Sequence, residues 1–102
     1  MNNTMYNVPS DVIENVKSYL ATYLHNYEVV KVMRKSVHTA DNYLYMVVAR
    51  HTKYPQIKRD YGGGEYTVWT CWNESTQSLN HGHYDIKTEE DAIEVAMKYF
   101  YN

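Results

Sequence analysis

Apolar residues recur at helical spacing near the start of the chain. After Pro9 they fall three or four positions apart over about four turns, which places them along one side of a helix. Asp11 followed by Glu14 resembles a capping box, so the helix is expected to begin near Asp11, after a loosely ordered tail over residues 1–9. The positions in this apolar stripe are Val12, Ile13, Val16, Tyr19, Leu20, Tyr23, Leu24 and Tyr27.

Four segments rich in β-branched and aromatic residues follow, separated by polar or glycine-containing stretches. In the first of them, Val30 and Val32 alternate with Lys31 and Lys35, as expected of a strand with one apolar face. Residues 51–64 lack a periodic pattern and end in three glycines, so they are predicted to form a flexible, basic and glycine-rich loop. The predicted strands are Glu28–Val37, Tyr43–Arg50, Glu65–Asn73 and Gln77–Ile86, the last weakened by Gly82.

A second helix is predicted near the end of the chain. Thr88 and Asp91 have the spacing of a helix N-terminus, and Glu89 and Glu90 suit its positive end. Its apolar stripe is Ala92, Ile93, Ala96, Tyr99 and Phe100. The predicted fold class is therefore α+β, in the order α-β-β-β-β-α, with two terminal helices packed on an antiparallel sheet of three to four strands. A chain of 102 residues fits one domain, residues 1–102.

The central strands carry apolar side chains on both faces, which is unusual for a sheet with one face in water. If both helices pack on one face, the other exposes aromatic rings, and such a surface is typical of an interface with a protein partner or a second copy. If the helices divide between the faces, those rings are core. The first reading assigns partner binding to Tyr43, Tyr45, Tyr66 and Trp72, with Trp69 replacing them if the register moves by one residue.

The net charge of −2 conceals a basic middle segment, residues 31–59, and an acidic C-terminal part. Cations interleaved with tyrosines suit single-stranded nucleic acid, or equally an acidic groove on a protein. The alternative is that the opposite charges pair with each other inside the fold. The candidate contact residues in the loop are Lys53, Tyr54, Lys58, Arg59 and Tyr61.

Little in the sequence points to chemistry. His81, His83 and Asp85 have a period of two, which would align them on one face of a strand as weak candidates for a metal site. Exposed or hydrogen-bonded histidines explain the same pattern, so neither a metal nor another cofactor is expected. The one cysteine, Cys71, excludes an intramolecular disulfide. No apolar run reaches the roughly 20 residues of a membrane span, so a cytoplasmic location without membrane contact is expected.

The functional prediction is a non-catalytic, tyrosine-rich protein-binding module. Its size and its lack of catalytic motifs suggest a small regulatory or inhibitory accessory protein of a phage or mobile element. The alternative is a nucleic-acid-binding module that uses residues 31–59. A third hypothesis is a small metal-dependent enzyme or sensor that uses His81, His83 and Asp85.

Overall fold

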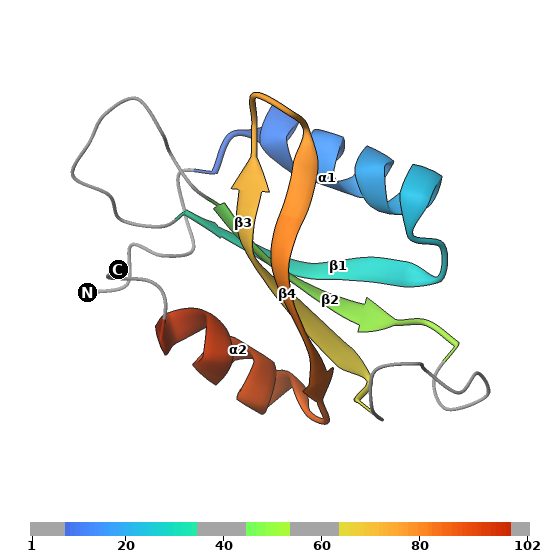
Figure 1. Cartoon of the computed structure of the whole chain (residues 1–102), viewed down its shortest axis with the longest axis vertical. Helices are drawn as coiled ribbons and strands as arrows, with labels where there is room; N and C mark the ends of the chain where they lie inside the picture. Colours follow the sequence, from blue (N-terminus) through green and yellow to red (C-terminus); the bar gives the residue numbers. More distant parts are fainter. Residues whose placement is uncertain (1–7, 35–44, 54–63, 99–102) are drawn as a thin grey trace.

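The computed structural model describes residues 8–34, 45–53 and 64–98. Within them, a four-stranded antiparallel sheet has one helix on each face (Figure 1). The predicted α+β class and the α-β-β-β-β-α order are confirmed. The elements are α1 (Ser10–Tyr23), β1 (Tyr27–Arg34), β2 (Tyr45–His51), β3 (Tyr66–Asn73), β4 (Ser78–Ile86) and α2 (Glu89–Lys98). No helix in these ranges is long and apolar enough to cross a membrane.

Each strand pairs with the next one along the chain, in the order β1-β2-β3-β4. The sheet is therefore a meander in which β2 and β3 are central and β1 and β4 lie at the edges. The burial follows this order, because six of the seven residues of β2 and five of the eight of β3 are buried. The two central strands consequently contribute buried residues to both hydrophobic clusters, which lie on opposite faces of the sheet.

Helix α1 covers one face of the sheet through three buried residues of its predicted stripe, Val12, Val16 and Leu20. They pack against alternate residues of β2, which confirms the predicted face of that strand from residue 45 onward. Burying this apolar stripe is what holds α1 to the sheet. The buried residues contributed by the strands to this cluster are Val32, Tyr45, Val47, Ala49, Trp69, Trp72 and Leu79.

Helix α2 covers the opposite face, where Ala92 and Ala96 are fully buried. Their small side chains bring the helix backbone close to the sheet. The strands contribute Met33, Met46, Val48, Val68 and Ile86 to this second cluster, which is called the α2 cluster below, as the first is called the α1 cluster. The helices therefore divide between the two faces, and the expectation of an uncovered aromatic face is wrong. Tyr45, Trp69 and Trp72 are 4%, 2% and 0% exposed and belong to the α1 cluster.

Two irregularities in strand pairing explain why some side chains lie on a different face of the sheet from the one predicted. The β1–β2 register shifts between Val29 and Lys31, so that Val30 packs on the α2 cluster and Val32 on the α1 cluster rather than on one face. Between Trp69 and Trp72, β3 contains one residue more than the matching stretch of β2. Such a bulge breaks the alternation of side chains, and it turns both indoles toward α1.

The predicted boundaries change in three places. Helix α1 begins at Ser10 with Pro9 as its N-cap and no side-chain cap, so Asp11 and Glu14 do not form a capping box. His51, the first residue of the predicted loop over residues 51–64, ends β2 and is 7% exposed, while residues 54–63 of that loop lie outside the described ranges. Gly64 is also buried, and a Cβ there would collide with the backbone of Ile86. This glycine serves a close approach of two backbone segments rather than a hinge.

Candidate functional site

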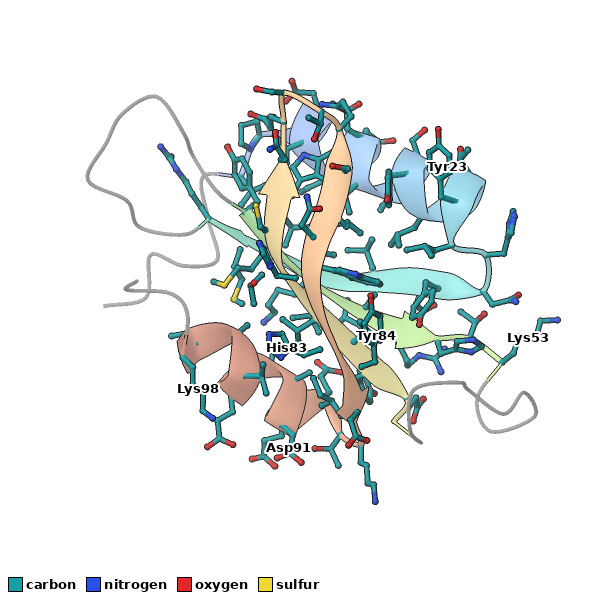
Figure 2. All side chains as sticks on the ribbon, viewed as in Figure 1. Tyr23, Lys53, His83, Tyr84, Asp91 and Lys98 are labelled. Atoms are coloured by element: carbon teal, nitrogen blue, oxygen red, sulfur yellow. The ribbon has the colours of Figure 1, made fainter. Side chains whose placement is uncertain are left out.

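Tyr23, at the end of α1, presents the most exposed large hydrophobic side chain in the described ranges, at 67%. Its ring contacts that of Tyr19 one turn earlier, with centroids 5.0 Å apart. Tyr19 in turn meets Trp72 edge-on at 5.7 Å. The three rings thus form a continuous aromatic path from solvent to the fully buried indole of Trp72. Figure 2 shows Tyr23 on the outer side of α1, where no other described element covers it.

Tyr23, Tyr19 and Trp72 also line a surface hollow of about 210 Å³, termed here the α1 hollow. Its helix residues share one face of α1, because they are spaced by three or four positions. None of the described residues that line it is charged, and most bear a hydroxyl or carboxamide. The lining residues are Asn15, Ser18, Tyr19, Thr22, Tyr23, Trp72 and Gln77. The hollow therefore combines aromatic walls with neutral hydrogen-bonding groups.

The turn between β3 and β4 supplies the far wall of the α1 hollow and is held by its own side chains. Asn73 Oδ1 accepts hydrogen bonds from the backbone N–H groups of Ser75 and Thr76, at 2.9 and 3.1 Å. Gln77 has a φ of 55° and donates from Nε2 to the carbonyl oxygen of Glu74 at 2.9 Å. These bonds fix the turn conformation, in the way that side-chain amides stabilise tight turns. The wall next to Trp72 is therefore preorganised.

A second aromatic row crosses the same face of the sheet. Tyr27 meets both His51 and Trp69 edge-on, with ring centroids 5.1 and 5.5 Å apart. Trp69 also meets Tyr84 edge-on at 6.0 Å. Tyr84, labelled in Figure 2, lies over Gly82, where a Cβ would approach its ring to 2.5 Å. The glycine in β4 thus makes room for a tyrosine that extends the cluster to the edge of the sheet.

Arg50 is the centre of a charged group on the α2 side of the sheet. Its guanidinium donates to Glu28 at 2.9 Å and to Glu65 at 3.0 Å. These two hydrogen bonds raise the pKa of Arg50 above its ordinary value. For this residue, the basic middle segment pairs with carboxylates inside the fold, which was the alternative reading of the charge pattern. Burial, followed by the charges of Glu65 and Glu89, raises the pKa of the neighbouring Tyr66.

The start of α2 presents a different surface. Glu89, Glu90, Asp91 and Glu94, with Ile93, line an open hollow of about 570 Å³. Carboxylates in a first helical turn are favourable because they oppose the helix dipole, so the cluster is explained by helix stability. A phosphate backbone would be repelled here.

The predicted basic and aromatic contact residues lie mostly outside the described ranges. Those outside are Tyr43, Tyr54, Lys58, Arg59 and Tyr61. Lys53 is described and its side chain is exposed, while its backbone N–H donates to His51 Nδ1 at 3.2 Å. Tyr66 is half-buried against the α2 cluster. The partner-binding role of these residues stays a prediction.

The weak metal candidates in β4 do not share the regular strand geometry that their spacing requires. His81 has a φ of 60°, and the β3–β4 register shifts between the positions facing Tyr66 and Val68. His83 pairs with Val68 and lies toward α2 (Figure 2), while Asp85 is exposed within the irregularity. Among the described residues, no three His, Cys, Asp or Glu side chains come close enough to hold a metal ion.

The α1 hollow contains residues that the sequence interpretation placed elsewhere. Tyr19 and Tyr23 were assigned to the apolar stripe, but Tyr19 is only half-buried and Tyr23 is exposed. A usable signal was present beside them. Asn15, Ser18 and Thr22 form a neutral polar stripe next to two tyrosines, whereas an ordinary solvent-facing stripe is rich in charge.

The family model of large polyvalent protein associated domain 24 matches residues 11–90, well over half of the chain. The chain belongs to this family. In this polyvalent protein associated domain, the match spans most of α1, all four strands and the first residues of α2. All residues that line the α1 hollow fall inside it. Searches of curated proteins and of solved structures found no match to the domain.

Proposed function

We propose that the chain is a non-catalytic protein-binding module that serves as a cytoplasmic accessory domain of a phage or another mobile element. The family to which it belongs is described by its association with large polyvalent proteins, which supports an accessory role beside other domains. The observation on which the binding role rests is the aromatic path of Tyr23, Tyr19 and Trp72 that opens on the α1 hollow.

The composition of this surface favours a protein partner. Tyrosine and tryptophan dominate the energetics of protein interfaces, because they bury a large rigid area and retain a polar group. A phosphate backbone, in contrast, is bound through lysine and arginine. Among the described residues, those that line the α1 hollow include no charged one. The partner is therefore a protein segment or a second copy of the chain, and a regulatory or inhibitory effect would arise by covering the partner's surface.

Capture experiments with matched variants test this function. Wild-type protein, Tyr23→Ala and Lys17→Ala are immobilised and exposed to extract of cells that produce the mobile element. Tyr23 lines the hollow, whereas Lys17 is exposed on α1 outside it. A partner that wild type and Lys17→Ala retain, and Tyr23→Ala loses, supports the proposal. Identical captured proteins with all three would contradict it. Sedimentation over a concentration range tests the homodimer with the same variants.

The same protein preparations distinguish nucleic-acid binding from the proposed protein binding. If residues 31–59 formed a binding surface, single-stranded oligonucleotides would bind with an affinity that falls steeply with salt. Arg50 contributes little to such a surface, because Glu28 and Glu65 already neutralise it. Salt-sensitive oligonucleotide binding that Tyr23→Ala leaves intact would favour the alternative over the proposal.

A further inference from the structure

Tyr23 and Tyr19 form a surface of two aromatic rings along the wall of the α1 hollow. Their ring centroids are 5.0 Å apart, and their planes are tilted by 47°. Tyr23 is 67% exposed and Tyr19 is half-buried, so a ligand in the hollow can contact both rings. Trp72 is fully buried and meets Tyr19 edge-on at 5.7 Å. It therefore supports the ring of Tyr19 and has no surface for a ligand.

Neutral hydrogen-bonding groups lie beside these rings. Asn15 provides a carboxamide, and Ser18 and Thr22 provide hydroxyls. Within the described part of the chain, these three side chains form no hydrogen bond. Gln77 donates one N–H of its carboxamide to the carbonyl oxygen of Glu74 and retains the second. The hollow therefore offers several free donors, and its described lining residues carry no charge.

Proteins bind peptide segments in a few recurring ways, and the lining of the α1 hollow disfavours most of them. Addition of a strand needs a sheet edge, but the lining comes from α1, from Trp72 in the central strand β3 and from the turn residue Gln77. A bound amphipathic helix needs an apolar groove, whereas four of the seven lining residues are Asn, Ser, Thr or Gln. Recognition of a phosphorylated or acidic segment needs arginine or lysine, which the described lining lacks.

A polyproline II segment matches the α1 hollow in chemistry and in length. Such a segment is recognised by aromatic side chains, and it has no internal hydrogen bonds, so its carbonyl oxygens are free to accept. Four of its residues span about 12 Å, at roughly 3.1 Å per residue. The lining residues of α1, from Asn15 to Tyr23, also extend over about 12 Å, at roughly 1.5 Å per residue. One short segment can therefore reach the tyrosines and the polar groups together.

We propose that the α1 hollow binds a proline-rich segment of a protein partner in the polyproline II conformation. This inference rests on the proposed protein-binding function and specifies the chemistry of the partner. Proline rings pack on Tyr23 and Tyr19. The side chains of Asn15, Ser18 and Thr22 donate hydrogen bonds to the carbonyl oxygens of the segment. Because a polyproline II segment is already extended in solution, little conformational entropy is lost when it binds.

Nuclear magnetic resonance titration with a defined peptide tests the proposal directly. The probe is N-acetyl-hexaproline amide. The control is the same peptide with alternating L- and D-proline, which has the same composition but cannot form the left-handed polyproline II helix. The probe should shift the backbone amide signals of residues 15–23 along a saturating curve, and the control should bind at least several-fold more weakly. Equal effects of the two peptides, or no shift in residues 15–23, would overturn the proposal.

Two pairs of variants locate the binding, and all four positions are exposed on α1, so each variant is expected to fold. Ser18→Arg places a long side chain in the lining, and Ala21→Arg adds the same side chain outside it. Tyr23→Ala removes the more exposed ring, and Lys17→Ala shortens a side chain outside the hollow. Probe binding should be lost in Ser18→Arg, fall at least several-fold in Tyr23→Ala and stay unchanged in both controls. Full binding by Ser18→Arg or by Tyr23→Ala would refute the site.

The outcome is separable from that of the proposed function. If a captured protein depends on Tyr23 while hexaproline does not bind, the chain binds a partner through another chemistry, and only the polyproline II proposal fails. If hexaproline binds at the hollow while capture is unaffected by Tyr23→Ala, the hollow recognises polyproline II and the protein-binding proposal fails.

Discussion

Tyr66 has its phenol at the edge of the α2 cluster, beside the carboxylates around Arg50. Burial first, and then the charges of Glu65 and Glu89, raise its pKa above the ordinary value of 10.0. The folded state therefore retains the proton more strongly than the unfolded state does. The resulting contribution to stability is complete below pH 10 and is lost as pH rises through the folded-state pKa.

The test compares alkaline unfolding of wild type and Tyr66→Phe. The variant keeps the ring but cannot ionise, so its free energy of unfolding should fall less steeply above pH 10. Glu65→Gln, which removes one of the charges, should give an intermediate slope. Parallel curves for wild type and Tyr66→Phe would show that Tyr66 ionises alike in both states.

Two glycines differ in what surrounds them, and the difference is measurable. A Cβ at Gly64 would collide with the backbone of Ile86, which cannot move without displacing the end of β4. At Gly82 the obstacle is the ring of Tyr84, a side chain that can rotate. Gly64→Ala should therefore destabilise by about 1–3 kcal/mol or more, the usual range for overpacking, and Gly82→Ala by less. Urea unfolding of both variants checks the order, and a larger loss in Gly82→Ala would contradict it.

The two helices begin differently. Thr88 Oγ1 accepts a hydrogen bond from the backbone N–H of Asp91 at 3.1 Å, whereas α1 has Pro9 as its N-cap and no side-chain bond. Thr88→Ala should consequently cost about 1 kcal/mol, the typical value of a cap. Ser10→Ala, at the first residue of α1, should change stability little. Thermal unfolding distinguishes the two, and equal losses would show that the Thr88 bond contributes nothing.

The elements were predictable from the sequence because each depends on local periodicity. Spacings of three and four placed Val12, Val16 and Leu20 on the buried side of α1, and alternation placed Tyr45, Val47 and Ala49 on one face of β2. The face of Trp72 was not predictable. It depends on an extra residue in β3 that appears only when β3 is paired with β2, and a single bulge reverses every position beyond it.

The neutral polar stripe of α1 could be read from the sequence, but the α1 hollow itself could not, for a related reason. Its residues come from α1, β3 and the turn that follows, and the sequence gives no distance between them. Tyr19 and Tyr23 fit the apolar period of the helix equally well whether the sheet covers them or not. Tyr19 is half-buried and Tyr23 is exposed, and this difference depends on how α1 lies on the sheet, which is a property of the assembled layers.

At the scale of the whole molecule, two hydrophobic clusters share one sheet. Leu20 is 2% exposed in the α1 cluster, and Ile93 is only partly buried beside the α2 cluster. Leu20→Ala should cost about 2–5 kcal/mol, and Ile93→Ala should cost less, because the methylenes it loses are partly in water already. Urea unfolding measures both. Equal losses would mean that Ile93 is more completely buried than the described contacts indicate.

Because the two clusters share one sheet, the protein is expected to unfold cooperatively. The buried residues of β2 alternate between the clusters, with Val47 in one and Val48 in the other, so neither cluster can lose β2 without disrupting the other. Leu20→Ala should therefore unfold in one transition. Tryptophan fluorescence reports the α1 side through Trp69 and Trp72, and far-ultraviolet circular dichroism reports the whole backbone. Midpoints that separate in the variant would show that the two sides unfold independently.

The meander order of the strands has a kinetic consequence. Every strand finds its partner in the segment made just before it, so each pairing closes a short stretch of chain and loses little entropy in doing so. Sheets of this kind need no late-arriving strand to insert between two earlier ones. β1, β2 and β3 can associate in turn while synthesis continues, and β4 with α2 then seals the second face. The exposed intermediate is the three-stranded sheet with its α2 side open, which makes that side the place where aggregation would begin during slow translation.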